Sequence, residues 1–338
     1  MRSEFIAAIG GFAIALLALP AILLLCRKLD LYDSLGPLKI HNRRVPRLGG
    51  VAIAAGTLTA AFLSGVVSSP RSVILLSTFI LVWGTGLIDD IRGLSPWIRL
   101  TVQLGAGLLL SLAGWSIRLF NMPVLDTIAT CILVAAFINA FNLLDGADGV
   151  AGSVALVIVL GYALLPAGQL SLSGRAVAWA LAGSCLAFMM FNFPPARIFM
   201  GDSGSTLLGL GIAFLGLDFC AANPGLDSRL GIPIVFAALP LVDLGLSILR
   251  RLRRRAPIFE GDRQHFYDLL LQHGWPAWRV ALTCSLCTAF FVVLGRVTSQ
   301  QPGLVFSLVF AASLLLFATI AVGLGSLRVE TESAPTIN

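Results

Sequence analysis

The sequence predicts an all-α, polytopic membrane protein. Of its 338 residues, 57% are hydrophobic and only 12% are charged, whereas a soluble domain carries about 25% charged residues. The mean hydropathy is +0.93, and the apolar residues form runs that match the roughly 20 residues a helix needs to cross a bilayer. These observations exclude a water-soluble globular enzyme and a disordered chain.

Eleven apolar segments are expected to cross the membrane, or ten if one of the two weakest, 204–220 and 230–249, does not. We interpret the first as an anchor, because no small-residue cleavage site follows it. The whole chain, 1–338, is expected to be one integral-membrane domain, with motifs in 38–268 and the last two spans and tail in 279–338. The expected spans are 5–26, 48–67, 72–88, 100–117, 123–142, 150–167, 176–193, 204–220, 230–249, 279–295 and 302–325.

Charge is unequally divided between the two alternating sets of flanking segments. The set that begins with 27–47 and ends with the C-terminal tail holds 17 basic residues, and the other set holds 6. The positive-inside rule therefore predicts a cytoplasmic first set and an N-terminus outside. The same set holds twelve of the 17 acids, which indicates a polar working face toward the cytoplasm. Asp243 falls within a span, where a charge is costly, so it is expected to face the bundle and pair.

Adjacent carboxylates end the third span. Asp89 and Asp90 are followed by Ser95 and Pro96, a pattern typical of a helix start. Neighbouring carboxylates repel, and a divalent metal or a proton shared with a substrate relieves that repulsion. The alternative is a solvated helix end.

A second acidic motif, N-L-L-D-G-A-D-G, follows the fifth span. Asp145 and Asp148 lie three residues apart and share one face of a helical turn. Asn139 and Asn142 precede them within apolar sequence. Oxygen ligands of this kind suit magnesium or manganese, although a polar turn between spans remains the alternative.

A third motif, F-N-F-P-P-A-R-I-F-M-G-D-S-G-S-T, covers residues 191–206. Its two prolines are expected to end one helix, and Gly201 to begin the next. Free N–H groups at that helix start suit a phosphate, and Asp202 could hold a metal. Phe199 could stack on a base or pack at the membrane interface.

Basic residues gather in two further segments of the predicted cytoplasmic face. Residues 38–50 supply Lys39, His41 and Arg47, and the loop 250–275 supplies five clustered arginines followed by Asp262, Arg263 and His265. Such groups suit phosphate, while topology and anionic lipid explain the arginine cluster equally well. No zinc motif occurs, and the six cysteines lie in or next to apolar runs, as reduced, packed thiols do.

Together these segments resemble the polyprenyl-phosphate N-acetylhexosamine-1-phosphate transferase family, glycosyltransferase family 4. The matching motifs are P-R-L-G-G, the Asp89–Asp90 pair, N-L-L-D-G-A-D-G, F-N-F-P-P-A-R-I-F-M-G-D-S-G-S and D-R-Q-H. They run in family order, and the span count fits. The resemblance implies transfer of a sugar 1-phosphate from a UDP-N-acetyl sugar to undecaprenyl or another polyprenyl phosphate, with release of UMP.

The resemblance also implies a magnesium cofactor, with manganese as the alternative, and roles for individual residues. Asp202 and Asp145 are implied as metal ligands. The catalytic residues implied are Asp89, Asp90 and Asp145. The substrate-binding residues implied are Asn142, Asp148, Asn192, Phe199, Lys39, His41, Arg47, Arg263 and His265.

One difference from the family's motifs narrows the choice of substrate. The family's histidine-rich motif is reduced here to His265, Phe266, Tyr267 and Asp268. This favours the undecaprenyl-phosphate N-acetylglucosamine-1-phosphate branch, which begins lipid-linked surface glycans, over phospho-N-acetylmuramoyl-pentapeptide transferase. A multi-span transporter and a non-catalytic scaffold are the remaining alternatives.

The expected partners are the two substrates and membrane lipids, with no nucleic acid. The expected location is the inner or plasma membrane. Family relatives can dimerise, and no motif decides between a monomer and a homodimer.

Overall fold

The fold is all-helical, in a computed structural model that describes residues 2–33, 44–64, 69–224, 231–259, 261–299 and 303–327. Within these ranges no strand occurs, and the one β-type pairing is an isolated bridge between Tyr32 and Pro46. The thirteen helices are α1 (Arg2–Lys28), α2 (Gly49–Leu63), α3 (Pro70–Arg92), α4 (Pro96–Leu112), α5 (Pro123–Leu144), α6 (Val150–Ala163), α7 (Leu172–Asn192), α8 (Gly201–Ala222), α9 (Gly231–Phe236), α10 (Ala238–Arg254), α11 (Phe266–Gln272), α12 (Ala277–Thr298) and α13 (Gly303–Gly323).

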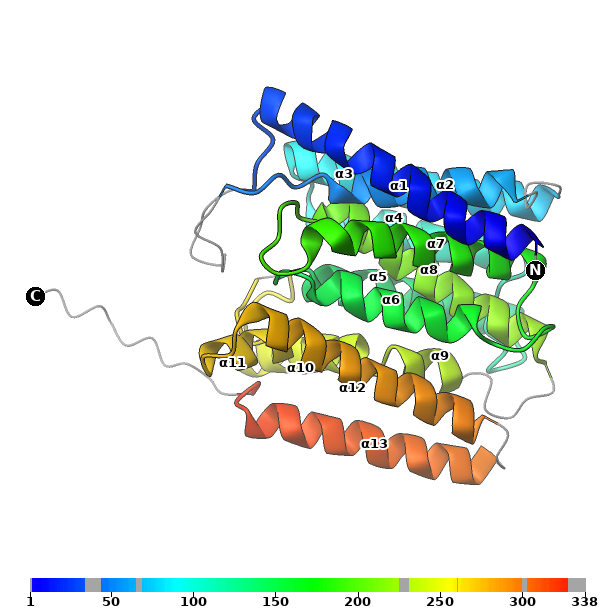
Figure 1. The fold of residues 1–338 in the computed structure, drawn as a ribbon. Helices are drawn as coiled ribbons and strands as arrows, with labels where there is room; N and C mark the ends of the chain where they lie inside the picture. The colour runs from blue at the N-terminus through cyan, green and yellow to red at the C-terminus, as the bar shows by residue number, and fades with distance from the viewer. Residues whose placement is uncertain are drawn as a thin grey trace, which may run out of the picture.

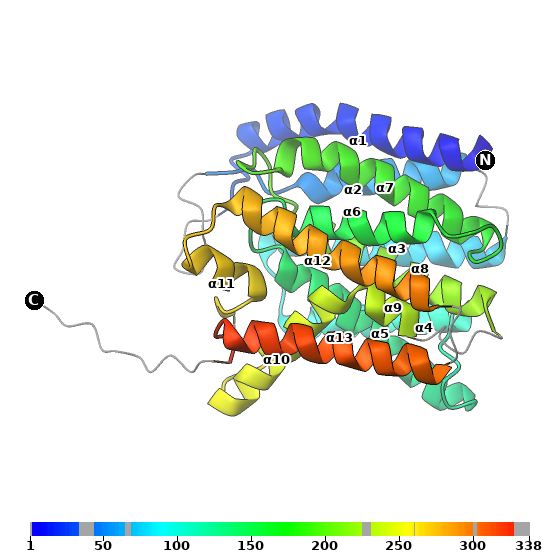
Figure 2. The ribbon, with the colours of Figure 1, turned by 60° about the horizontal axis from the view of Figure 1, so that its bottom comes forward.

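The long helices lie side by side with their axes roughly aligned, and successive long helices run in opposite directions (Figure 1). The bundle therefore has two ends. One end carries α11 and the end of α13, and we call it the α11 end; the other carries the start of α1, and we call it the opposite end (Figure 1 and Figure 2). Where the structure describes them, the segments predicted to share the cytoplasmic face lie at the α11 end.

The helices confirm a polytopic membrane bundle. Seven of them, α1, α3, α5, α7, α8, α12 and α13, are long and apolar enough to cross a membrane, and α2, α4 and α6 are shorter apolar helices. The predicted span 230–249 differs, because it is two helices that break at Ala237. Pro240 explains the break, since proline lacks an N–H and its ring clashes with the carbonyl four residues earlier, that of Phe236.

Helix ends follow the local signals. Ser95 caps α4 by accepting a hydrogen bond from Trp97 N at 3.4 Å, with Pro96 in the first turn. The helix α7 ends at Asn192, just before the two prolines, and α8 begins at Gly201. These boundaries confirm the sequence predictions.

The helix α8 forms the centre of the bundle. Residues 203–220 are all buried, and α8 contacts α2, α3, α5, α6, α7 and α9. By contrast, α1 and α13 lie on opposite outer edges (Figure 1). The first turn of α8 is thus held from several sides, and its position fixes the site described below.

Small residues let other helices approach the start of α8. A β-carbon on Gly86 of α3 would lie 2.6 Å from the Asp202 carbonyl oxygen and 2.7 Å from the Ser203 Cα. Real β-carbons essentially never show contacts under 3.0 Å. Close packing of this kind is how membrane helices associate when no hydrophobic gradient drives them.

We expect Gly86→Ala to lower the thermal unfolding temperature of the detergent-purified protein. The added methyl group presses on the backbone of α8, and overpacking of this kind costs about 1–3 kcal/mol. Gly84→Ala is the matched control, because a β-carbon on Gly84 meets nothing within 4 Å. Equal unfolding temperatures for the two variants would contradict this account of the contact.

Candidate active site

The start of α8 is held by a carboxylate from α3. Asp90 accepts hydrogen bonds from Asp202 N at 2.8 Å and from Ser203 N at 3.0 Å. Gly201, the first residue of α8, has φ +74°. A β-carbon on Gly201 would collide with the Asp90 carboxylate, 2.7 Å away. These two amides were expected to be free for phosphate, and that expectation is wrong, because Asp90 occupies them.

Its neighbour Asp89 is held differently. The carboxylate accepts a hydrogen bond from Leu94 N at 2.5 Å and pairs with Arg99 at 2.8 Å. The side chains of Asp89 and Asp202 lie close enough to interact electrostatically, and Arg99 also acts on Asp202. The two adjacent acids therefore have different roles, since Asp90 caps the start of α8 and Asp89 lies near the Asp202 carboxylate.

The end of α5 supplies the amide side chains. Asn142 donates a short hydrogen bond from Nδ2 to Asp202 Oδ1, and the same nitrogen lies 3.2 Å from Ser205 Oγ. One turn earlier, Asn139 donates to Gln103 Oε1 of α4 at 2.5 Å. Asn142 thus orients the Asp202 carboxylate, whereas Asn139 ties α5 to α4.

The turn after α5 shapes the loop that joins α7 to α8. Asp148 accepts a hydrogen bond from Ala196 N at 2.9 Å. Gly149 adopts φ +74° and donates its N–H to Asn192 Oδ1 at 3.1 Å. Asn192 in turn donates to the Ile198 carbonyl at 2.8 Å. Two predicted substrate-binding residues, Asp148 and Asn192, therefore fix the backbone of this loop.

The same loop is paired with the segment before α2. Phe199 N donates to the Pro46 carbonyl at 2.7 Å, and Gly49 N donates to the Phe199 carbonyl at 2.9 Å. Arg47, which lies between Pro46 and Gly49 in the sequence, forms a 4.0 Å ion pair with Asp33. The P-R-L-G-G motif and the third acidic motif are therefore one structural unit.

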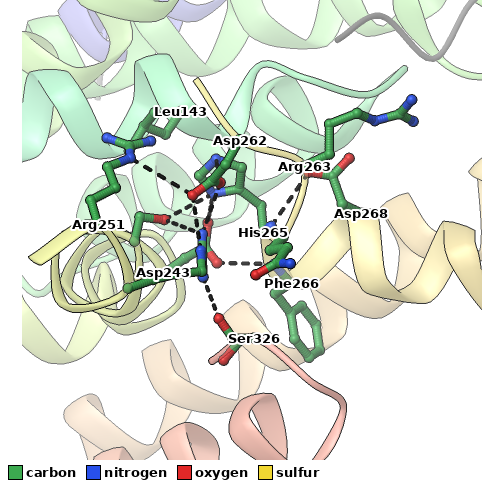
Figure 3. Close-up of polar contacts among 12 residues, drawn as sticks. Leu143, Asp243, Arg251, Asp262, Arg263, His265, Phe266, Asp268 and Ser326 are labelled. Atoms are coloured by element: carbon green, nitrogen blue, oxygen red, sulfur yellow. Dashed lines mark hydrogen bonds and ion pairs between the residues drawn. The ribbon is translucent and has the colours of Figure 1, made fainter. Parts of the chain in front are cut away.

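A second cluster surrounds His265 (Figure 3). The His265 Nδ1 lies 2.7 Å from Asp243 Oδ2, and Nε2 lies 3.6 Å from Asp262 Oδ1. Asp243 Oδ1 also accepts the Phe266 N–H at 2.9 Å. The expectation that Asp243 faces the bundle and pairs is therefore confirmed, and its partners are a histidine and a helix start.

Arg250 connects this cluster to the last helix. Its guanidinium forms two hydrogen bonds with the Asp262 carboxylate, at 2.9 and 2.8 Å, and a third with the Ser326 carbonyl at 2.5 Å. Arg250 is 1% exposed. A buried arginine needs such full pairing, so the turn after α13 is part of the support of the α10–α11 loop.

Charges in this cluster shift one another's pKa. Burial opposes ionisation of Asp262, yet the hydrogen bonds and charge of Arg250 bring the net pKa of Asp262 below its ordinary value. Burial likewise opposes protonation of His265, but the charge and hydrogen bond of Asp243 raise the pKa of His265 overall. Burial raises the pKa of Asp268 to about 6.

Tyr267 joins the two clusters. Its hydroxyl donates to the Leu143 carbonyl at 3.1 Å, and a β-carbon on Gly146 would overlap the tyrosine ring. The ring stacks on His265, with centroids 5.6 Å apart and planes 6° apart. Tyr267 also interacts electrostatically with Asp145, the C-cap residue of α5. The glycine of the N-L-L-D-G motif is therefore the residue that admits the tyrosine.

The predicted site residues fall into three neighbouring groups at the α11 end. Lys39 and His41 lie outside the described residues. Around the start of α8 lie Asp89, Asp90, Asn142 and Asp202; in the paired loops lie Arg47, Asp148, Asn192 and Phe199; beside α11 lie Arg263 and His265. Asp145, the C-cap residue of α5, interacts electrostatically with Tyr267. The Arg263 guanidinium points away from the Asp243–His265 pair (Figure 3).

Sequence reasoning missed three partners. Arg99 lies one turn beyond the Ser95–Pro96 start, Gln103 is a polar residue inside a predicted span, and Arg250 was grouped with a topological arginine cluster. The signal for Gln103 was available, since a buried amide within a span requires a partner. No comparable signal separates Arg250 from its neighbouring arginines.

The carboxylates near α8 fit a divalent cation. Asp89 and Asp202 present oxygen atoms to each other, and magnesium prefers carboxylate oxygens with several waters. Among the described ranges, no group of three or more His, Cys, Asp or Glu side chains forms a preorganised metal cage. A pair of carboxylates completed by substrate phosphates and water matches the usual magnesium arrangement.

We expect Asp90→Ala to destabilise the folded protein. The change removes both hydrogen-bond acceptors at the start of α8, and losing a helix cap costs about 0.5–2 kcal/mol. Thermal unfolding in detergent measures the effect. Asp30→Asn is the control, because Asp30 is exposed, lies 3.4 Å from Arg44 and has φ +54°, a conformation that asparagine tolerates. An Asp90→Ala protein as stable as this control would refute the capping role.

Stability should also fall as pH rises through neutrality. Protonated His265 stabilises the fold fully below its ordinary pKa of 6.5, and this contribution disappears as pH rises through the raised pKa of the folded state. The raised pKa of Asp268 acts in the same direction, because the folded protein favours its neutral form. Unfolding temperatures measured between about pH 5 and pH 8 should decline less steeply in His265→Gln than in wild type.

The matched control for this pH series is His273→Gln. His273 contacts the Leu269 carbonyl at 2.7 Å instead of a carboxylate. The unfolding temperature of His273→Gln should decline with pH as steeply as that of wild type. Identical slopes for wild type and His265→Gln would show that the cluster does not set the pH dependence.

Comparison with known proteins agrees with this geometry. Residues 72–219 match the model of the family described as Glycosyl transferase family 4. The chain is 33% identical over 282 residues to a decaprenyl-phosphate N-acetylglucosaminephosphotransferase of Mycobacterium leprae, covering 72% of this chain and 70% of the relative.

Two other relatives cover similar or larger shares. A probable undecaprenyl-phosphate N-acetylglucosaminyl 1-phosphate transferase of Bacillus subtilis is 26% identical over 325 residues, or 93% of this chain and 90% of the relative. A phospho-N-acetylmuramoyl-pentapeptide-transferase of Moorella thermoacetica is 34% identical over 270 residues, or 70% and 79%. The chain belongs to glycosyl transferase family 4, the polyprenyl-phosphate N-acetylhexosamine-1-phosphate transferases.

Proposed function

We propose that the protein transfers an N-acetylhexosamine 1-phosphate from a UDP-sugar to a polyprenyl phosphate and releases UMP. The observation that carries the proposal is the convergence of Asp89, Asn142 and Asp202 at one end of a membrane bundle. Relatives named as N-acetylglucosaminyl 1-phosphate transferases support the reaction class. Family membership leaves no support for a transporter or a scaffold.

The residues around α8 position charge for phosphoryl transfer. Such reactions depend on alignment and on neutralising phosphate oxygens. Asp90 fixes the first turn of α8, Asn142 orients the Asp202 carboxylate, and Arg99 holds Asp89. Bound at Asp89 and Asp202, magnesium would neutralise charge on the phosphates. Asp145, at the end of α5, is the further acidic residue for which we propose a place at the metal or the phosphates.

The paired loops form the proposed donor side. Asp148 and Asn192 hold the backbone of the α7–α8 loop, and Phe199 is placed within it. A phenylalanine whose backbone is fixed in this way suits stacking of its ring on a base. His265 is 3% exposed, with Nδ1 engaged by Asp243. Its role in donor binding is therefore to hold the α10–α11 loop, from which Arg263 would contact a phosphate of the donor.

The α11 end is proposed to face the cytoplasm of a cell whose inner or plasma membrane holds the protein. The arginine-rich end of α10 supports this orientation, because basic segments remain on the cytoplasmic side. The donor, a soluble nucleotide sugar, would approach from that side. The acceptor phosphate would lie at the membrane surface beside Asp89.

The sugar is proposed to be N-acetylglucosamine or a deoxy N-acetyl sugar. Phe266 and Tyr267 follow His265, where the pentapeptide transferase carries consecutive histidines. Tyr267 is buried against the N-L-L-D-G turn, and its bulk supports a donor unlike that of the pentapeptide transferase. The product would begin a lipid-linked surface glycan.

The test is UMP release by the purified protein in detergent, with undecaprenyl phosphate, magnesium and a panel of UDP-N-acetyl sugars. Release with one sugar, abolished by a chelator, is expected. Asp202→Asn should lower the rate at least about 100-fold, because charge stabilisation worth several kcal/mol is removed. Asp30→Asn, the same chemical change at an exposed residue of the same end, should retain activity.

Two results would overturn the proposal. One is UMP release that is unaffected by Asp202→Asn. The other is an absence of both release and UDP or UMP binding in protein whose unfolding transition shows that it is folded.

A further inference from the structure

A polar cavity lies at the opposite end of the bundle, far from Asp89 and Asp202 of the candidate active site. The connection between α4 and α5 borders this open cavity, whose volume is about 390 Å³. Its polar lining consists of Ser111, Ser116, Arg118, Asn121, Asp126 and Thr127. Nothing in the proposed transfer reaction uses this cavity.

The acidic residue of the cavity, Asp126, uses only one of its two carboxylate oxygens in hydrogen bonds among the described residues. Asp126 is 6% exposed, and its Oδ1 accepts the N–H groups of Leu119 and Phe120 at 3.0 and 2.8 Å. Across the described ranges, Oδ2 receives no hydrogen bond. Asp126 lines the cavity, and Oδ2 is not among the buried polar atoms that lack a partner, so this oxygen is accessible to a ligand from the cavity. The cavity therefore presents an acceptor that suits a cationic donor.

The same cavity presents a positive charge. Arg118 lines it and forms no ion pair with any acid in the part of the chain that the structure describes. The neighbouring hydroxyls are already engaged, since Ser111 bonds to Thr127 at 2.9 Å and Ser116 lies 3.3 Å from Thr130. Among the described residues, the lining groups left for a ligand are the Arg118 guanidinium, the Asn121 side-chain amide and one carboxylate oxygen of Asp126.

Exposed apolar side chains lie at the end of α4, at the start of α5 and in the segment between them. In a bundle that crosses a membrane, exposed side chains of this kind contact the acyl chains of lipids. The exposed members are Leu112, Leu119, Phe120, Met122, Val124, Leu125 and Ile128. A ligand that enters the cavity is thus placed with its polar part inside and its apolar part along α4 and α5.

We propose that this cavity binds the headgroup of a phospholipid that carries both a phosphate and a primary amine, as phosphatidylethanolamine does. The phosphate pairs with Arg118, and the ammonium donates to Asp126 Oδ2. Phosphatidylcholine fits less well, because its quaternary ammonium has no N–H to donate. Phosphatidylglycerol fits less well, because it brings no cation to the carboxylate.

The test is lipid retention by the full-length protein, measured by native mass spectrometry with the three lipids matched in acyl chains. Wild type should retain phosphatidylethanolamine about tenfold more strongly than the others, as expected for one charge-assisted hydrogen bond. Arg118→Gln should weaken all three, because each carries the phosphate. Asp126→Asn keeps an acceptor for the two backbone N–H groups and should abolish the preference for the primary amine.

Arg296→Gln is the matched control, since it removes one cation from the last turn of α12 at the same end and should change nothing. Thermal unfolding and UMP release confirm that each variant is folded. Equal retention of the three lipids by wild type, or equal effects of Arg118→Gln and Arg296→Gln, would overturn the proposal. Soluble phosphoethanolamine that binds as tightly as the lipid would also overturn it, because the acyl chains would then contribute nothing.

Discussion

The hydrogen bonds between the Asp90 carboxylate and the first turn of α8 are the contact on which the rest of the site depends. The first N–H groups of a helix have no partner within the helix, and at α8 a side chain from α3 satisfies two of them. This contact fixes the position of α8 along its axis relative to α3. Because Asp202 stands on that first turn, its distance to Asp89 follows from the same contact. Glycines at positions 50, 86, 201 and 204 then let α2, α3 and the preceding loop close around it.

The remaining polar groups at the α11 end are supports arranged around this point. The α7–α8 loop is held by Asp148 and Asn192, and the α10–α11 loop is held by Asp243 and Arg250. Tyr267 lies between the two sets and bonds to the end of α5. Many of the polar residues in the motifs therefore act on backbone rather than directly on a ligand. This division is typical of sites in which reactive groups are few and their positions are strongly constrained.

Sequence reasoning predicted the class of fold and the gathering of acids at one end, because both follow from hydropathy and from charge counts. It also located the helix boundaries at Ser95, Asn192 and Gly201, where proline, serine and glycine act locally. It did not assign different tasks to Asp89 and Asp90, since neighbours in sequence acquire different partners only when α4 and α8 have packed. The pairing of Asp243 with His265 was likewise out of reach, because 22 residues separate them. The break at Ala237 was missed, although Pro240 marked it.

The bond from Arg250 to the Ser326 carbonyl has a consequence for biosynthesis. A chain emerging from the ribosome inserts α1 to α12 before the turn after α13 is made. Until that turn arrives, the buried Arg250 guanidinium lacks one of its acceptors, and the α10–α11 loop lacks one of its anchors. The order of synthesis thus delays completion of the α11 end until the last helix has been translated. A nascent or prematurely terminated chain would then hold nearly all of the bundle while its loop cluster remained unfinished.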